Sequence, residues 1–576
     1  MPSNRIILTS FFFLSLLIFS HGLSIHGIEY RDDEIFYYQS TQEMIQNHDF
    51  LSPTYFGENR FEKPILIYWL ILLSYKIFGI NWFAARFPAV IFAALTVCLT
   101  WKMARVLFNQ RIATLSALIL MTIPLFFRHA KNAVPGMPLT FFILLALYSL
   151  LRIIRAEELP PDQKQRQQNK DSLLFFIACA LGFMIKGYTA IIVPWGTLFI
   201  YAIWSKTPGL LKTIRFGRGI LVFLFITSPW FIYMILRHGH VYLDHIFIVE
   251  TKDRLVGGGA GFPLIVWISR FIDHSAFYIQ NMFSYFSPWP VFFFLGIPLL
   301  VKQSSVNSSL KFLLSWFGLA FFFFSSIYFS INHYLMALVV PFAILVSYIF
   351  LAEEQTEVIR KLQKFLIIVI FTIGFLGFNL FLVLFIGISK IWLGMALIVY
   401  VILLRIFLVS KTPLTAPVLL SVFILSVSYH SGLLGKAGLI SITTLQRFAK
   451  TINSDPTHDY LIGVGSHDIH GKEFQVYFDQ KIQKIGKSED HRTRLRLRRF
   501  FENNKRLYCL ILDKDLKKFF RKPPDKSFKV IQEDFIVRRR VPVDKNFFIA
   551  LIKLDQPAIR RYLMEKIVLI RRDPHA

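Results

Sequence analysis

The stretch RFEKPILIYW, residues 60–69, places two opposite charges and a proline directly before a run of large apolar side chains. The unbroken apolar part, from Ile65 to Tyr75, has 11 residues. As a helix it would measure about 17 Å, whereas the hydrocarbon core of a bilayer is about 30 Å thick. We therefore predict that residues 64–80 form a helix lying in the membrane interface, with Pro64 in its first turn.

The composition of the chain indicates a partly lipid environment. Of its 576 residues, 55% are hydrophobic and 62 are phenylalanine, and the mean hydropathy is +0.51. A soluble protein of this length could not bury so much apolar surface, so we predict an α-helical polytopic membrane protein. The net charge of +28 suits anionic lipid or phosphate-bearing substrates and does not require nucleic acid. The three scattered cysteines imply neither a disulfide framework nor a zinc cluster.

Thirteen apolar runs are long enough to cross a bilayer. The first is interpreted as an uncleaved span, because no small-x-small cleavage site follows it. The predicted spans are residues 5–24, 84–101, 112–128, 137–151, 172–186, 188–205, 219–236, 279–301, 312–330, 333–352, 365–389, 391–409 and 414–433.

The distribution of lysine and arginine sets the orientation of these spans. With a cytoplasmic N-terminus, the inner loops hold 18 Lys and Arg, and outer loops of similar length hold four. Cytoplasmic loops carry the excess of basic residues, so this orientation is favoured, and counting residues 64–80 as a span would invert it. Two larger outer loops follow, residues 25–83 and 237–278.

The chain changes character near residue 439. YLIGVGS (460–466), RLYCLILD (506–513) and FFIALIKL (547–554) are typical of strands between charged helical stretches. We predict a transmembrane domain over residues 1–438 and a small extracytoplasmic α/β domain over residues 439–576.

The middles of the predicted spans contain no ionisable residue. Ion-coupled transporters usually keep a carboxylate or a base near the membrane midplane. The sequence therefore favours an enzyme whose polar residues lie at the outer rim. A transporter or a lipid-linked sugar translocase is the distant alternative.

Two charged motifs at that rim are candidates for chemistry. Asp32, Asp33 and Glu34 are adjacent carboxylates just beyond a span, a pattern typical of a general base or a metal ligand, or of an acidic helix start in a solvated turn. Glu62 suits the positive end of the helix that follows it. Lys63 does not suit it, and either binds a ligand or extends to a lipid phosphate.

The chain also carries an ordered series of motifs. In order they are D-E-x-x-Y (Asp33, Glu34, Tyr37), G-x-x-x-F-E-K-P (Gly57, Phe61, Glu62, Lys63, Pro64), Tyr68-Trp69, and F-G-x-x-x-F-A-A-R-x-P from Phe78 to Pro88. This series resembles the N-terminal signature of the GT-C glycosyltransferases, which include the protein O-mannosyltransferases and the aminoarabinose transferases that modify lipid A. Weaker matches continue to about residue 350: MPLTFF (137–142), IKG (185–187), PW (229–230), Glu250 with Arg254, and HYL (333–335).

The resemblance implies an enzyme that moves a sugar from an undecaprenyl- or dolichyl-phosphate carrier to an acceptor on the outer face, with inversion at the anomeric carbon. It implies catalytic roles for Asp33, Glu34 and Glu62, and a contact of Lys63 with the carrier phosphate. Further substrate-binding candidates are Tyr37, Lys186, Arg254 and Tyr334. The spacing of FEKP and the basic tail favour lipid A or a lipopolysaccharide core as acceptor in a bacterial inner membrane. Protein O-mannosylation is the alternative.

The sequence departs from the family pattern at four positions. Gly136 replaces a second outer acid, Phe36 replaces an arginine, and Ser330 or a neighbouring residue stands where a lysine usually precedes the H-Y pair. Thr251 takes the place of the histidine that pairs with the FEKP glutamate at a zinc site in the aminoarabinose branch. A divalent metal held by Glu62 is the cofactor that the resemblance implies, and this departure puts the metal site in question. The loop histidines His238, His240 and His245 could substitute as ligands or be solvated.

Three further motifs lie in the tail. SHDIH (466–470), with His458 upstream, has the residue types of a metal site but no second ligand cluster. RTRLRLRR (492–499) is a solvated helix face or docks on anionic lipid. The glycine pair in GVG (463–465) is not a nucleotide-binding fingerprint.

Overall fold

The computed structural model describes residues 3–24, 33–252, 264–352 and 357–381, and beyond them residues 398, 401–402, 405, 442–455, 460–464, 482–484, 507–513, 516, 528–537, 546, 549 and 556–572. The chain divides into two compact units. The first comprises Met1–Leu23, Tyr37–Ile373 and Val401–Ser426, and the second comprises Ser24–Phe36, Gly374–Tyr400 and Val427–Ala576.

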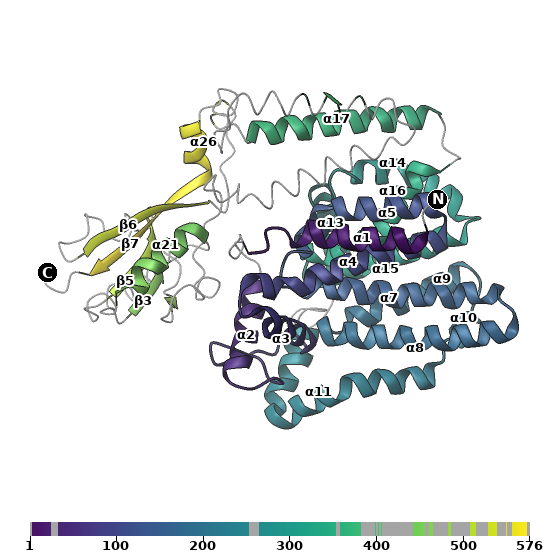
Figure 1. The fold of residues 1–576 in the computed structure, drawn as a ribbon, viewed down its shortest axis with the longest axis horizontal. Coiled ribbons are helices and arrows are strands. Elements are labelled where there is room, and N and C mark those ends of the chain that lie inside the picture. Colours follow the sequence, from purple (N-terminus) through teal and green to yellow (C-terminus); the bar gives the residue numbers. More distant parts are fainter. Residues whose placement is uncertain are drawn as a thin grey trace. The chain divides into compact units, whose positions relative to one another are not determined.

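The first unit is a bundle of long helices (Figure 1). Its helices are α1 (Asn4–Ser20), α4 (Trp82–Leu107), α5 (Gln110–Thr122), α6 (Pro124–His129), α7 (Gly136–Arg155), α8 (Pro161–Lys186), α9 (Thr189–Trp204), α10 (Leu210–Thr213), α11 (Phe216–Asp244), α13 (Leu264–Tyr285), α14 (Pro290–Ser304), α15 (Ser308–Ser326), α16 (Val339–Leu351) and most of α17 (Glu357–Phe381). The Asn81, Asn109 and Asn307 side chains each cap the helix that follows by accepting backbone N–H groups.

Four helical segments of the described chain are long and apolar enough to cross a membrane: Trp82–Leu107, Gly136–Glu158, Phe216–Thr251 and Ser308–Ser326. Six shorter apolar helices accompany them: Asn4–Ser20, Leu66–Phe78, Gln110–Thr122, Thr189–Trp204, Pro290–Ser304 and Val339–Leu351. The polytopic fold class is confirmed. The count of thirteen spans stays a prediction, since residues 391–409 and 414–433 lie almost wholly outside the described chain.

Among the described residues, two predicted spans are each divided between two α-helices, and the predicted span 333–352 is divided between the 3-10 segment η3 (Asn332–Ala337) and α16. Residues 112–128 divide at Ile123 into α5 and α6, because Pro124 has no N–H with which to continue the helical ladder. Residues 279–301 divide between α13 and α14, where the sequence SPWP interrupts the apolar run. Helix α13 also begins at Leu264, within the predicted outer loop 237–278.

The first outer loop folds into α2 (Glu34–Gln46), the hairpin β1 (Thr54–Tyr55) and β2 (Glu58–Asn59), and α3 (Leu66–Phe78). Figure 1 shows α2 and α3 at one end of the bundle. The predicted helix after FEKP is confirmed, although Pro64 precedes the N-cap, Ile65, instead of lying in the first turn. Its position in the membrane interface stays a prediction.

The described strands of the second unit form a five-stranded sheet in the order β4-β3-β5-β7-β6. Strands β4 (Ile482–Lys484), β3 (Tyr460–Val464) and β5 (Leu507–Leu512) are parallel, and β7 (Met564–Arg572) runs antiparallel to β5 and to β6 (Phe528–Val537). Helix α21 (Ile442–Asn453) packs Phe448 and Ile452 against the sheet, and α26 (Gln556–Leu563) precedes β7.

The predicted α/β fold of the tail is confirmed. The first two predicted strands appear as β3 and β5. Of FFIALIKL, the structure describes Ile549, which is helical, so a strand across that residue is wrong. The antiparallel strand between β5 and β6 is instead β7, a run of four apolar residues (567–570) flanked by charged residues, and it was not predicted from the sequence. SHDIH, His458 and RTRLRLRR lie outside the described residues.

Candidate active site

The Glu43 carboxylate on α2 holds the β1–β2 hairpin by hydrogen bonds. Its Oε1 accepts from the backbone N–H of Phe56 (2.6 Å), and Oε2 accepts from Thr54 Oγ1 (2.6 Å) and the backbone N–H of Gly57 (3.2 Å). Phe56 and Gly57 have φ of 50° and 76°, the positive values that a tight two-residue hairpin turn needs. Since β2 runs directly into RFEKP, this clamp positions the loop that carries Lys63.

A second set of contacts joins the same loop to α11. The Asp49 carboxylate pairs with Arg237 at 2.7 Å, and Ser52 Oγ lies 2.7 Å from His238 Nε2. Trp230 Nε1 donates to a backbone carbonyl in the loop at 2.9 Å. Segments about 180 residues apart in the chain are therefore held together by polar contacts.

Helix α11 breaks at Gly239, whose φ of 56° and ψ of −134° suit glycine. The chain then continues through a π-helical segment, η2 (His245–Lys252), that contacts the FEKP loop. The Phe61 ring lies 5.0 Å from the His238 ring, 5.3 Å from Tyr242 and 5.9 Å from His245. Phe61 is therefore an apolar contact between the two predicted outer loops.

Lys63 and Glu250 form an ion pair across this contact. Lys63 Nζ lies 3.0 Å from Glu250 Oε2 and also donates to the Glu62 backbone carbonyl at 2.5 Å. Both side chains are nearly buried, at 11% and 14% exposure, so the attraction between them is screened less than in a surface pair. Lys63 is thus fixed as a cation at this end of the bundle.

Arg60 forms the second charged pair of the loop. Its guanidinium lies 3.4 Å from Glu62 Oε2, its Nε donates to Tyr68 Oη at 3.1 Å, and it lies over the Tyr37 ring at 5.6 Å. Tyr37 is 2% exposed and packs against the Tyr68 ring. Tyr37, a substrate-binding candidate from the sequence, therefore contacts the Arg60 side chain from within the protein.

The two described acids of the first motif differ in exposure. Asp33 is exposed and precedes α2, and Glu34 is the first residue of that helix with a fully buried side chain. An acid in the first turn stabilises a helix through its dipole. Asp33 is therefore the more accessible of the two predicted catalytic carboxylates.

Lys186 and Tyr334 were separate candidates in the sequence, and the structure brings them together. Lys186 Nζ lies 5.4 Å from the centre of the Tyr334 ring, which also stacks on Phe324 at 4.7 Å. Lys186 ends α8, where Gly187 with φ of 78° turns the chain, and Tyr334 lies in the 3-10 segment η3 (Asn332–Ala337).

Gly136, where the family pattern has an acid, lies against His129. A Cβ atom at residue 136 would come within 2.7 Å of His129 Nδ1. Burial, followed by the charges of Arg128 and Lys186, lowers the pKa of His129 to about 3, so the ring is neutral at physiological pH. The space beside residue 136 is therefore taken by a neutral imidazole.

Comparison with known proteins shows what this chain is similar to. Residues 62–233 match the family described as dolichyl-phosphate-mannose-protein mannosyltransferase. A protein of Aquifex aeolicus (strain VF5) described as uncharacterized is 29% identical over 64% of this chain and 68% of its own length. An undecaprenyl phosphate-alpha-4-amino-4-deoxy-L-arabinose arabinosyl transferase 1 of Pseudomonas fluorescens is 29% identical over 58% of this chain and 59% of its own length. The chain thus spans little more than half of that transferase.

The crystal structure of ArnT from Cupriavidus metallidurans bound to undecaprenyl phosphate matches the fold with a TM-score of 0.68. The match covers 98% of this chain and 97% of that one, at 16% identity. This chain has the GT-C fold. The resemblance to GT-C-type polyprenyl-phosphate-sugar glycosyltransferases is therefore confirmed.

Within the GT-C fold, the described residues do not supply a metal site. No group of three histidine, cysteine or acidic side chains lies close enough together in the described chain to hold a metal ion. Glu62 Oε2 is buried without a hydrogen bond, but it faces the Arg60 cation at 3.4 Å. Thr251 Oγ1 donates to the Ile246 carbonyl at 2.8 Å, and His238 contacts Ser52. These residues do not fit a divalent metal centre, and no step below uses one.

The three loop histidines differ in their exposure to solvent. His238 and His245 are half-buried against Phe61, and His245 Nε2 is buried without a hydrogen bond, whereas His240 is exposed. Arg254 lies outside the described residues. Sequence reasoning missed Arg60, Glu43 and His129. A charge adjacent to FEKP could have indicated Arg60, but nothing in the sequence indicates that Glu43 reaches the hairpin.

Proposed function

We propose that this chain is an integral-membrane glycosyltransferase that moves a sugar from a polyprenyl-phosphate carrier to a lipid acceptor, with lipid A or a lipopolysaccharide core favoured. The observation that carries the proposal is the fixed Lys63 cation, paired with Glu250 in a GT-C fold. The match to an undecaprenyl-phosphate arabinosyl transferase supports the carrier class.

Lys63 would bind the carrier phosphate. A lysine ammonium has three donors, so it can contact a phosphate oxygen by exchanging one of its present partners. Negative charge grows on the phosphate oxygen as the bond to the anomeric carbon breaks, and a fixed cation stabilises that charge. Arg254, by the resemblance, would add a second contact to the same phosphate.

Asp33 would orient the acceptor and, for a hydroxyl acceptor, take its proton. The acceptor oxygen forms a bond to the anomeric carbon from the face opposite the phosphate, the bond to the phosphate oxygen breaks, and the polyprenyl phosphate leaves as an anion. The configuration is therefore inverted. The exposure of Asp33 supports its assignment over the buried Glu34. Glu62 would orient Arg60 and the loop, and Lys186 with Tyr334 would contact the substrate.

Protein O-mannosylation remains the second candidate, because residues 62–233 match the mannosyltransferase family. A mixed acceptor assay separates the two. The purified full chain is given a radiolabelled polyprenyl-phosphate sugar with either lipid A or an unfolded acceptor protein, and label in the lipid is expected. Label in protein alone would favour the mannosyltransferase, and movement of the intact donor between leaflets without transfer would favour a translocase.

The site assignment has its own controls. Asp33→Asn and Lys63→Ala are expected to lower transfer about 100-fold or more, as loss of one charged transition-state contact does. Lys302→Ala removes an exposed lysine from the end of α14 and is expected to leave transfer unchanged. Normal transfer by Lys63→Ala would reject the assignment of the phosphate site.

The proposal includes a location in a bacterial inner membrane with this site on the periplasmic face. Asn59, exposed in β2, allows a direct test by replacement with cysteine. In intact cells an impermeant thiol reagent is expected to label Asn59→Cys and not Arg166→Cys, an exposed residue near the start of α8 on a predicted inner loop. The reverse pattern would invert the topology.

A further inference from the structure

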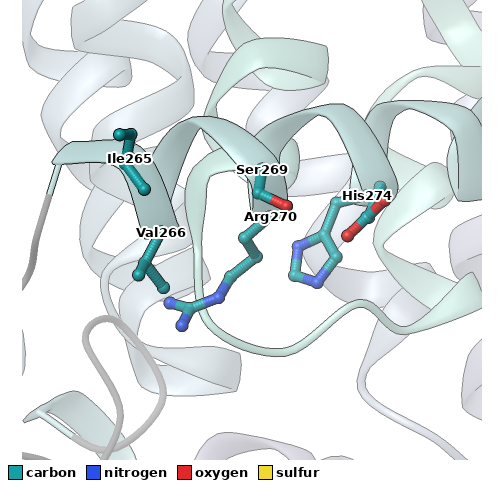
Figure 2. Close-up of a pocket in the computed structure, with 6 residues that line it drawn as sticks. Ile265, Val266, Ser269, Arg270 and His274 are labelled. Carbon is teal, nitrogen blue, oxygen red and sulfur yellow. The ribbon is translucent and has the colours of Figure 1, made fainter.

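A cavity lies along one side of α13, apart from the residues of the candidate active site. Its volume is about 450 Å³, and it is lined by Ile265, Val266, Ser269, Arg270, Asp273 and His274. The spacing of these residues along the helix, with pairs recurring every four positions, places them on one face. Figure 2 shows the Arg270 and His274 side chains extending from the same side of the helix.

The chemical groups on this face match one kind of ligand. Apolar side chains come first, at Ile265 and Val266, which are 79% and 44% exposed. The Arg270 guanidinium follows, and the exposed Asp273 carboxylate comes one turn later. Side chains three residues apart on a helix lie about 5–6 Å apart, which is close to the separation of phosphate and amine in an ethanolamine phosphodiester.

The Arg270 side chain is held in place by an aromatic ring. Its guanidinium lies 4.4 Å from the centre of the Tyr328 ring, in the segment that follows α15. This stacking fixes the plane of the guanidinium, whose five donors can still serve a phosphate beside other partners. The cation is thus presented at a set position in the cavity.

The charge of the cavity argues against a purely anionic ligand. His274 Nδ1 is buried and has no hydrogen-bond partner in the described chain. Burial, followed by the nearby Arg270 charge, lowers the pKa of His274, so the imidazole adds no second positive charge at neutral pH. Among the described lining residues, one cation and one carboxylate remain, and an anionic headgroup would meet repulsion from Asp273.

From these groups we infer that the α13 cavity binds a bilayer phospholipid with a primary-amine headgroup, with its phosphate on Arg270 and its ammonium on Asp273. The apolar side chains exposed beside the cavity, Leu264 (71%), Ile268 (43%) and Ile272 (60%), favour a membrane lipid over a soluble phosphoamine.

Lipid binding to the purified full chain tests this inference independently of transfer. Native mass spectrometry in detergent compares phosphatidylethanolamine with phosphatidylglycerol of the same chains. The wild type is expected to retain one phosphatidylethanolamine about tenfold more tightly than phosphatidylglycerol. Arg270→Gln is expected to weaken both lipids about tenfold, and Asp273→Asn is expected to abolish the preference between them.

Matched variants on α8 control for the loss of one charge. Arg166→Gln and Asp162→Asn alter exposed residues and are expected to leave both lipids unaffected. Equal binding of the two lipids by the wild type, or unchanged binding by Arg270→Gln, would overturn the inference. Phosphoethanolamine that competes as well as the lipid would identify a soluble ligand and also contradict it. If Arg270→Gln fails to fold, Arg270→Lys, which keeps the charge, provides the same comparison with a smaller expected loss.

Discussion

Lys63 and Glu250 are 187 positions apart in the chain, and their side chains lie 3.0 Å apart in the fold. The pair joins the two predicted outer loops at the residue proposed to hold the carrier phosphate. Because both side chains are nearly buried, removing one partner leaves an uncompensated charge in a poorly hydrated position.

A double-mutant cycle on this pair should show strong coupling. We expect Lys63→Met and Glu250→Gln each to lower the free energy of unfolding by about 3 kcal/mol, and the double variant to lose less than their sum. Denaturant unfolding monitored by fluorescence measures all three. Additive losses would mean that the two side chains do not interact in solution.

Loss of the Glu43 carboxylate should loosen the hairpin before it affects the bundle. Glu43→Ala leaves the Phe56 and Gly57 N–H groups and the Thr54 hydroxyl without their acceptor. We expect faster hydrogen exchange at residues 54–59, and a destabilisation of about 1–3 kcal/mol. Glu357→Gln, whose side chain is 78% exposed, is the control and should change neither quantity. Unchanged exchange in the hairpin would show that Glu43 is not its clamp.

The close contact between Gly136 and His129 predicts that Gly136→Ala destabilises the protein and that a second substitution at His129 removes the clash. Gly136→Ala introduces a Cβ within 2.7 Å of His129 Nδ1. Overpacking costs about 1–3 kcal/mol, so a net loss of stability is expected. In the double variant with His129→Ala, the part of the stability loss that comes from the steric clash should disappear. Gly209→Ala, which meets nothing within 4 Å, is the control. Equal thermal stability of Gly136→Ala and wild type would contradict the packing.

How far the sequence could predict this site depends on how far apart in the chain the interacting residues are. The helix after FEKP and strands β3 and β5 follow from local apolar patterns, and the sequence predicts them. The Lys63–Glu250 pair and the contact of Lys186 with Tyr334 depend on how distant segments pack, and no local pattern contains that information. The motif resemblance supplied Lys63 and Glu250 as separate residues, and the fold supplied their pairing.

Substitution of Gly239 should loosen the contact between the two predicted outer loops. Its φ of 56° and ψ of −134° lie in a region that residues with a Cβ avoid, so Gly239→Ala strains the backbone. We expect a loss of about 1–3 kcal/mol and a more accessible Phe61, measured by hydrogen exchange in residues 60–63. Gly217→Ala, in the first turn of the same helix with nothing within 4 Å, should be neutral. Normal protection in the FEKP loop of Gly239→Ala would show that this turn does not position it.

The stability of the protein should depend on pH through Lys131. Lys131 is 2% exposed, and its Nζ donates to the His21 carbonyl at 2.6 Å. Burial, followed by the nearby Arg86 charge, lowers the pKa of Lys131 from 10.5 to about 7. The unfolded chain therefore binds more protons between pH 7 and pH 10.5, so stability rises with pH across that window. Below pH 7 the lysine is protonated in both states, and the cost of burying its charge is fully present.

Lys131→Met isolates this contribution. The wild type is expected to gain at most about 1.4 kcal/mol per pH unit from this one group between pH 7 and pH 10, and Lys131→Met is expected to lose that slope. Denaturant unfolding at several pH values measures both proteins. The other titrating groups are the same in both proteins, so their contributions cancel in the difference between variant and wild type. Parallel pH profiles for the two proteins would show that Lys131 remains charged in the fold at pH 9, and the His21 carbonyl would then be accepting from an ammonium throughout this range.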